Sequence, residues 1–146
     1  MKIENVLSLA FNEGTEEYEV LKDAYKLITS SYPSVASEAK NHMIMLDHSR
    51  TKLATLYYGV CRNISHLKDM TQSTYDTQYT RLVKMGRPSK DAIEAEIRST
   101  NGEYAGVSKQ IKDLEDVKDL ISMYMRCIDS NKSTVTEILR NVYRID

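Results

Sequence analysis

The chain has 146 residues, of which 41% are hydrophobic and 28% charged, and its net charge is −1. This composition argues against a wholly disordered chain, and the sequence holds no run of about 18 apolar residues, which a membrane-spanning helix needs. The two cysteines, Cys61 and Cys127, lie far apart in the sequence. We therefore expect no disulfide framework, a reducing compartment and a cytoplasmic location.

The charges are unevenly distributed along the chain. Residues 1–47 carry four basic and eight acidic residues, residues 48–90 carry eight basic and two acidic residues, and residues 91–146 carry eight basic and eleven acidic residues. The middle third is therefore a basic segment of charge +6 between two acidic segments. Such segregation is informative about binding partners rather than about the fold.

A first helix is predicted over residues 15–30. Its apolar and aromatic residues recur at three- and four-residue spacing, its first turn is rich in Glu, and Thr15 is a suitable N-cap. The recurring residues are Tyr18, Leu21, Tyr25 and Ile28. Pro33 ends this run, and a second, basic helix is predicted from Ser34 to about Lys68, with Gly59 as its weak point.

Residues 69–89 are rich in Thr, Ser and Gln and end in Gly86 and Pro88. We predict a basic connecting loop here, with room for a short helix through Tyr75 and Tyr79 or for a small hairpin. We therefore predict one domain, a single helical unit over residues 1–146. In this unit, the loop connects the helices of residues 1–68 to a final long helix.

The final helix is predicted over residues 90–144, with Ser89 as its N-cap. An a/d heptad pattern, with Ile93 as the first d position and Ile97 as the first a position, places an apolar residue or Tyr at twelve of fifteen positions. Gly102 and Gly106 are possible kinks. The predicted fold class is all-α: an elongated protomer with a long C-terminal amphipathic helix.

The N-terminal helices are too short to cover this apolar stripe, so we expect a second copy to cover it in a homo-oligomer. A monomeric three-helix bundle, with the long helix broken at Gly102, is the alternative. The residues expected to make the oligomer contacts are Ile111, Leu114, Ile121, Met125, Ile128, Val135 and Leu139.

The basic middle segment is the candidate binding site. Cations beside aromatic rings suit single-stranded nucleic acid, because the charges follow the phosphates while the rings stack on bases. The candidate cations are Arg50, Lys52, Arg62, Lys68, Arg81, Lys84, Arg87 and Lys90, and the nearby rings are Tyr75 and Tyr79. An ordinary solvated loop is the alternative interpretation of residues 81–90.

No catalytic function is expected. The three histidines lack the spacing of a metal site, and the sequence holds none of the common phosphate-binding, metalloprotease or serine-hydrolase motifs. We therefore predict a protein that is not an enzyme and needs no cofactor or metal. Gly86-Arg87-Pro88 matches part of an AT-hook, but Met85 stands where that motif has its first Arg.

Two stretches resemble the UvsY family of phage recombination mediators. One is the helix end Lys52-Leu53-Ala54-Thr55-Leu56-Tyr57-Tyr58-Gly59, and the other is the heptad helix from about Asp91 to Arg144 with its polar joint at Asp129–Lys132. The resemblance covers about half of the chain and implies DNA contacts near Tyr57 and Tyr58. Lys52 matches a basic position of the family, whereas the second basic position is Ala54 here, which moves the expected contacts toward Arg50, Arg62 or residues 81–90.

The resemblance also implies the function and the partners. Members form ring-like homo-oligomers, bind single-stranded DNA, contact a single-strand-binding protein and load a RecA-like recombinase, which here would occur in the cytoplasm of a phage's host cell. A structural or adaptor coiled coil without nucleic-acid binding, such as a scaffold or virion-assembly factor, is the main alternative. A regulator that binds duplex DNA is another.

Overall fold

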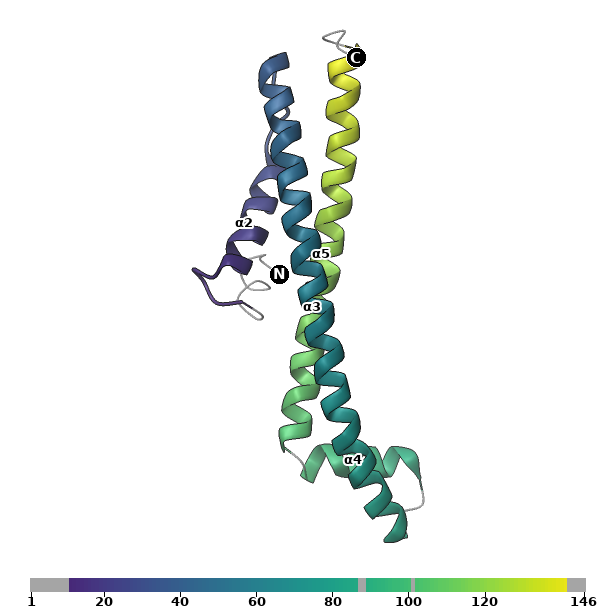
Figure 1. Cartoon of the computed structure of the whole chain (residues 1–146). Helices are drawn as coiled ribbons and strands as arrows, with labels where there is room; N and C mark the ends of the chain where they lie inside the picture. Colours follow the sequence, from purple (N-terminus) through teal and green to yellow (C-terminus); the bar gives the residue numbers. More distant parts are fainter. Residues whose placement is uncertain (1–10, 87–88, 101, 142–146) are drawn as a thin grey trace. The chain divides into compact units, whose positions relative to one another are not determined.

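The computed structural model describes residues 11–86, 89–100 and 102–141, and all regular secondary structure in these ranges is α-helical (Figure 1). The helices are α2 (Glu16–Thr29), α3 (Ala36–Lys84), α4 (Lys90–Thr100) and α5 (Gly102–Asn141). The all-α fold class and the long C-terminal helix are therefore confirmed, while the homo-oligomer stays a prediction. Within these described ranges, none of the helices has both the length and the apolar character that crossing a membrane requires.

The chain divides into two compact units, and the single helical unit over residues 1–146 stays a prediction. Unit 1 comprises Met1–Gly59 and Val117–Asp146, and unit 2 comprises Val60–Asp116. Because α3 and α5 are long, each contributes one part to unit 1 and another to unit 2.

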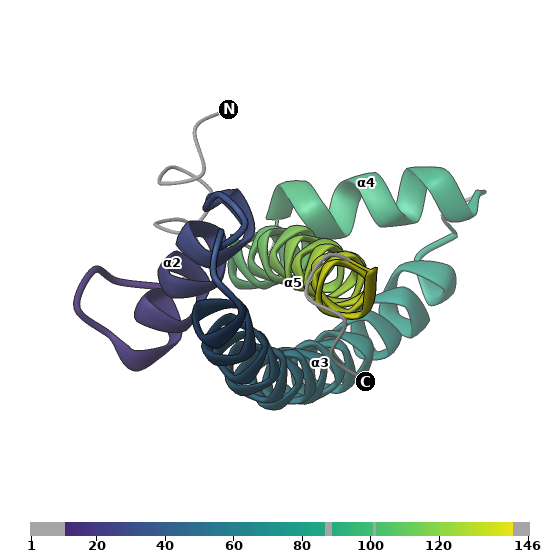
Figure 2. The same cartoon turned by 90° about the horizontal axis from the view of Figure 1, so that it is seen from above.

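Unit 1 packs α2 against the first part of α3 and the last part of α5. The Thr15 hydroxyl accepts a hydrogen bond from the Tyr18 backbone N at 3.3 Å, so the predicted N-cap of α2 is confirmed. The buried side chains of α2 are Tyr18, Leu21 and Ala24. In Figure 2, α2 lies beside the dark blue part of α3.

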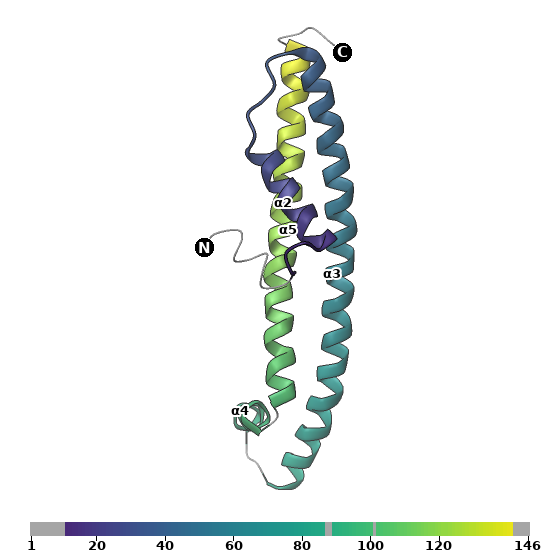
Figure 3. The same ribbon diagram turned by 90° about the vertical axis from the view of Figure 1, so that its left-hand side faces the viewer.

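The facing parts of α3 and α5 in unit 1 are antiparallel (Figures 1 and 3). Their core is apolar, and its most buried members are Ala39, Leu46 and Leu53 from α3, with Val117, Ile121, Tyr124, Ile128 and Val135 from α5. Two ion pairs flank this core, Arg50 with Asp129 and Asp47 with Lys132. The partners are three residues apart on each helix, as the antiparallel arrangement requires.

Unit 2 contains the rest of α3, which corrects one prediction. The predicted loop over residues 69–89 is wrong for residues 69–84, because these belong to α3. The hydroxyls of Thr71, Thr74 and Thr77 donate to backbone carbonyls one turn earlier, at 3.0, 3.3 and 3.0 Å. Such bonds satisfy the hydroxyl groups within a helix, so a Thr-rich composition does not end it.

The end of α3 and the start of α4 follow ordinary capping chemistry. Gly86 has a φ of +82°, the left-handed conformation that commonly follows a helix, and its backbone N donates to the Val83 carbonyl at 3.0 Å. The Ser89 hydroxyl accepts from the Ala92 backbone N at 3.1 Å, so the predicted N-cap is confirmed. Arg87 and Pro88 lie outside the described residues.

Where the sequence predicted one helix over residues 90–144, the structure describes two, α4 and α5, and residue 101 lies outside the described residues. In unit 2, Ile93 and Ile97 of α4 pack with Leu82 of α3 in a small buried cluster. Because α4 thereby buries its own apolar face, it need not continue the axis of α5. Gly106 lies within α5, so it does not interrupt the helix.

Candidate nucleic-acid interface

The residues predicted to bind DNA are divided between the two units. Arg50, Lys52, Tyr57 and Tyr58 belong to unit 1, and Arg62, Arg81, Lys84 and Lys90 belong to unit 2. Arg87 lies outside the described residues. The two groups are therefore considered separately.

Arg50 is occupied by contacts within the protein. Its Nε lies 3.1 Å from Asp129 Oδ1, its Nη2 lies 3.5 Å from Asp129 Oδ2, and its Nη1 lies 2.8 Å from Met125 Sδ. A guanidinium held by a carboxylate through two nitrogens has little capacity left for a phosphate. Arg50 is better explained as a link between α3 and α5 than as a DNA contact.

Unit 2 presents the remaining basic residues to solvent. Arg62, Arg81 and Lys84 of α3 and Lys90 of α4 are all exposed. Arg81 and Lys84 lie in the last turn of α3, where positive charge also offsets the negative end of the helix dipole. Lys68 forms an ion pair with Glu115 at 3.0 Å. Three of the predicted cations, Arg81, Lys84 and Lys90, therefore lie exposed at the end of α3 and the start of α4.

Two tyrosines lie in the same part of unit 2. The rings of Tyr75 and Tyr79 are stacked, with centroids 5.7 Å apart and an interplanar angle of 27°. Both rings are half-buried and pack against the cluster of Leu82, Ile93 and Ile97. The cluster fixes the rings in place, which lowers the entropic cost of stacking a base beside them.

A polar groove of about 320 Å³ adjoins Tyr75, and we name it the α3–α4 groove. It is lined by Thr71, Gln72, Tyr75, Lys90 and Glu94. Gln72 donates from Nε2 to Asp76 Oδ1 at 2.7 Å, which leaves its carbonyl oxygen as an acceptor toward a ligand. The groove thus combines a ring, one cation, one carboxylate and hydrogen-bonding groups, of which the ring and the cation suit a nucleotide.

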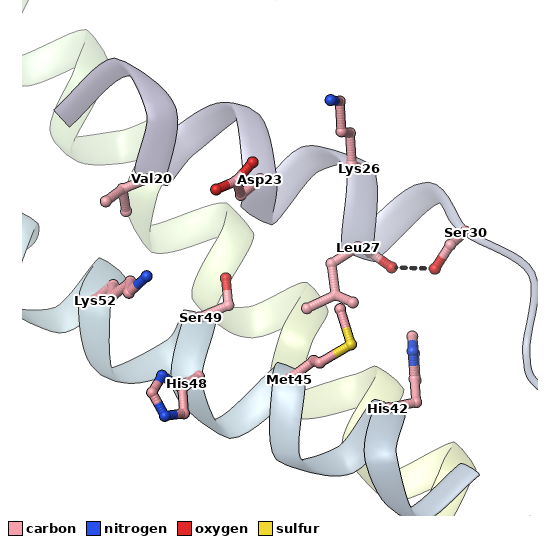
Figure 4. A pocket seen from close by; sticks show the side chains of 10 residues that line it. All are labelled: Val20, Asp23, Lys26, Leu27, Ser30, His42, Met45, His48, Ser49 and Lys52. Atoms are coloured by element: carbon pink, nitrogen blue, oxygen red, sulfur yellow. Dashed lines mark hydrogen bonds between the residues drawn. The ribbon is translucent and has the colours of Figure 1, made fainter. Parts of the chain in front are cut away.

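The Tyr-Tyr element of unit 1 presents mainly Tyr58, whose side chain is 64% exposed, whereas Tyr57 is half-buried. Lys52 is exposed one and a half turns earlier on α3 and lines a second groove. This α2–α3 groove has a volume of about 460 Å³ and is formed by one face of each helix (Figure 4). Its lining residues are Val20, Asp23, Lys26, Leu27, Ser30, His42, Met45, His48, Ser49 and Lys52.

The histidines of this groove do not form a metal site. Among residues 11–86, 89–100 and 102–141, no group of three or more His, Cys, Asp or Glu side chains is placed to hold a metal ion. His42 is buried, and burial lowers the pKa of its imidazole. A neutral ring beside Met45 contributes packing rather than charge.

Three of the residues expected at an oligomer interface are buried within the protomer. Ile121, Ile128 and Val135 are at most 1% exposed, because α2 and α3 cover them in unit 1. The other four, which are half-buried, are Ile111, Leu114, Met125 and Leu139. The most buried stripe of α5 in unit 1 therefore combines the d positions with Val117 and Tyr124, which are g positions, rather than with the predicted a positions.

The two grooves contain residues that sequence reasoning did not select, above all Gln72 in unit 2 and Met45 in unit 1. Thr71, Tyr75, Gln78 and Leu82 follow helical spacing and are half-buried or buried, so the sequence did contain a signal for the helix that carries Gln72.

No known protein family, curated protein or solved structure matches the chain.

Proposed function

We propose that this protein binds single-stranded DNA through unit 2 and acts as a recombination mediator rather than as an enzyme. The exposed Arg81, Lys84 and Lys90, together with the Tyr75–Tyr79 stack of the same unit, carry the DNA-binding part of the proposal. The mediator role rests on the resemblance to UvsY-type proteins. In that role, a homo-oligomer in the cytoplasm of a phage's host cell loads a RecA-like recombinase onto DNA covered by single-strand-binding protein.

Phosphate contacts explain why the exposed cations matter. Each Lys or Arg that neutralises a phosphate releases condensed counterions, so affinity for single-stranded DNA is sequence-tolerant and falls with salt. The stacked tyrosines and the α3–α4 groove add contacts to bases, which favour a strand with unpaired bases over a duplex. Each protomer then contributes a modest binding surface.

Oligomer formation would convert these modest surfaces into tight binding. When one strand contacts several protomers, each further contact is intramolecular, and the overall affinity rises without a stronger individual site. The half-buried a positions of α5, such as Met125 and Leu139, are one apolar surface that could make such contacts.

Charge reversal tests the site. We compare the wild-type protein with an Arg81→Glu/Lys84→Glu double variant by fluorescence anisotropy of a labelled single-stranded oligonucleotide at rising salt. The double variant should bind at least tenfold more weakly at low salt, and the magnitude of its log–log salt slope should fall by about 1.4, for two phosphate contacts. The matched control is Lys109→Glu/Lys112→Glu, which reverses two exposed charges of unit 2 on α5.

The outcomes separate the hypotheses. Equal affinities of the two double variants would reject the site while leaving DNA binding intact. Absence of binding by the wild-type protein at low salt would reject the function, and would favour a structural or adaptor coiled coil. Tighter binding to a duplex of the same length would favour a duplex-DNA regulator.

A further inference from the structure

The end of α3 in unit 2 carries an apolar side chain that stays in contact with water. Met85 directly follows the last residue of α3 and is 65% exposed, the largest value among the large apolar side chains of the described residues. Its backbone N donates to the Arg81 carbonyl at 3.2 Å and to the Leu82 carbonyl at 3.1 Å. In Figures 1 and 3 this end of α3 extends beyond α4. The helix thus holds Met85 at a position that a partner can reach.

Two exposed cations lie on the same side of α3 as Met85. Arg81 precedes Met85 by four residues and Lys84 by three. Residues at these spacings are neighbours on a helix, with Cβ atoms about 5–6 Å apart. Among the described residues between 77 and 90 there is no Asp or Glu, and Asp91 follows in the first turn of α4. A partner that covers Met85 therefore also meets positive charge, which favours an anionic partner with an apolar surface.

Single-stranded DNA has both properties. Its phosphates are anionic, and its unpaired bases expose faces that are covered by neighbouring base pairs in a duplex. Methionine suits any of the four bases, because its side chain is unbranched and flexible and its polarisable sulfur makes favourable contacts with aromatic rings. Such a contact is tolerant of sequence and selective for unpaired bases.

An anionic membrane surface also combines negative charge with an apolar layer. Membrane binding, however, scales with the apolar area that enters the layer, and even a single myristoyl chain binds only marginally. The single Met85 side chain offers less apolar area than such a chain. Contact with a base needs only one side chain, so the observations favour DNA.

We propose that Met85 contacts the face of an unpaired base while Arg81 and Lys84 hold neighbouring phosphates. Met85 thereby adds selectivity for single-stranded over duplex DNA, whereas the two cations attract the phosphates of either form. The inference rests on the proposed function, since it concerns the same DNA-binding part of unit 2.

The test measures binding of the full-length protein to three labelled oligonucleotides of one length, by fluorescence anisotropy at low salt. The first is a single strand, the second is a single strand of abasic sites with the same phosphates, and the third is a duplex. Met85→Ser should bind the first about three- to tenfold more weakly than the wild type, because an apolar contact is lost. It should bind the second and third within about twofold of the wild type. Met85→Leu keeps an apolar side chain and should match the wild type on all three.

Val83→Ser is the matched control at the same end of α3. Val83 is 49% exposed, and residues two positions apart on a helix do not face the same side. This variant should bind all three oligonucleotides within about twofold of the wild type. Circular dichroism verifies that each variant is folded. Equal losses in Val83→Ser and Met85→Ser would overturn the proposal, because the effect would then belong to the helix end as a whole.

The remaining outcomes distinguish this inference from the proposed function. Absence of wild-type binding to the single strand rejects the proposed function, and the inference with it. Binding by the wild type that Met85→Ser leaves unchanged overturns the inference alone, and so does an equal loss on the single strand and the abasic strand. If Met85→Ser keeps its affinity for DNA but loses binding to vesicles that contain phosphatidylglycerol, Met85 contacts lipid and its assignment to DNA is wrong.

Discussion

Arg50 on α3 and Asp129 on α5 are joined by a two-nitrogen ion pair, with Nε 3.1 Å from Oδ1 and Nη2 3.5 Å from Oδ2. One turn away on each helix, Asp47 pairs with Lys132. Nearby, the Tyr32 hydroxyl lies 3.2 Å from Asn131 Oδ1. These contacts fix the register of α3 and α5 beside an apolar core that by itself would tolerate sliding.

The Asp129→Asn variant should lose a small amount of stability. The two side chains of the pair are 36% and 53% exposed, so water and salt screen their attraction. We expect the free energy of unfolding to fall by about 0.2–1 kcal/mol. Urea denaturation at low salt and at 1 M salt measures this effect, and the difference between variant and wild type should shrink at 1 M salt. An equal difference at both salt concentrations would mean that the pair acts through packing.

Arg50→Glu should affect DNA binding less than Arg81→Glu does. Arg50 already contacts Asp129 and Met125, whereas Arg81 is exposed at the end of α3. We expect Arg81→Glu to weaken binding of a single-stranded oligonucleotide severalfold more than Arg50→Glu, in anisotropy titrations at low salt. A larger effect of Arg50→Glu, in a variant that is still folded, would indicate that the DNA contacts lie in the first part of α3.

Ile128→Ala should destabilise the protomer itself. Ile128 is fully buried in unit 1, and truncation of such a side chain costs about 2–5 kcal/mol. Met123, which is 44% exposed on the same helix, is the control, and its change to Ala should cost less than about 0.5 kcal/mol. Thermal unfolding distinguishes the two. Loss of the oligomer without loss of helix stability in Ile128→Ala would instead support its predicted role at a subunit interface.

Local sequence signals predicted the local parts of the fold. Thr15, the Glu-rich turn after it and Ser89 act within one helical turn, so the sequence near each cap contains all the information that is needed. For residues 69–84, the Thr-rich composition predicts a loop, whereas the spacing of Thr71, Tyr75, Gln78 and Leu82 matches the helix that forms. The bonds from Thr hydroxyls to carbonyls one turn earlier make that composition compatible with a helix.

Long-range contacts limited the prediction of the site. The exposed Arg81, Lys84 and Lys90 are predictable from their charge and from the nearby Tyr75 and Tyr79, which are local features of the sequence. The pairing of Arg50 with Asp129 joins residues 79 positions apart, which no spacing rule reveals. The a/d frame of α5 likewise predicted d positions that are buried in unit 1. It did not predict the burial of Val117 and Tyr124, because α5 packs there against both α2 and α3 rather than against one partner.

Gly59→Ala should stabilise α3. A Cβ at this position meets no atom within 4 Å, and the residue lies inside the helix, where Ala is favoured over Gly by about 0.5–1 kcal/mol. The matched control is Gly86→Ala. Gly86 also has open space around its Cα, but its φ of +82° should cost an L-residue about 1–2 kcal/mol. Urea denaturation of the two variants should therefore show changes of opposite sign, and a loss of stability in Gly59→Ala would contradict the helical assignment there.

Tyr124→Phe should make the protein more resistant to alkali. Burial, helped by Tyr25 and Cys127, raises the pKa of the Tyr124 phenol to about 12 from an ordinary value of 10.0. The folded protein therefore keeps the proton that the unfolded chain releases above pH 10, so stability falls as the pH rises from about 10 to 12. The variant removes this loss. At pH 8 the change should be neutral or slightly stabilising, because the buried hydroxyl has no hydrogen-bond partner among the described residues. Urea midpoints at pH 8 and pH 11 measure both effects. A Tyr124→Phe variant that loses as much stability as the wild type between these pH values would show that the phenol does not cause the alkaline loss.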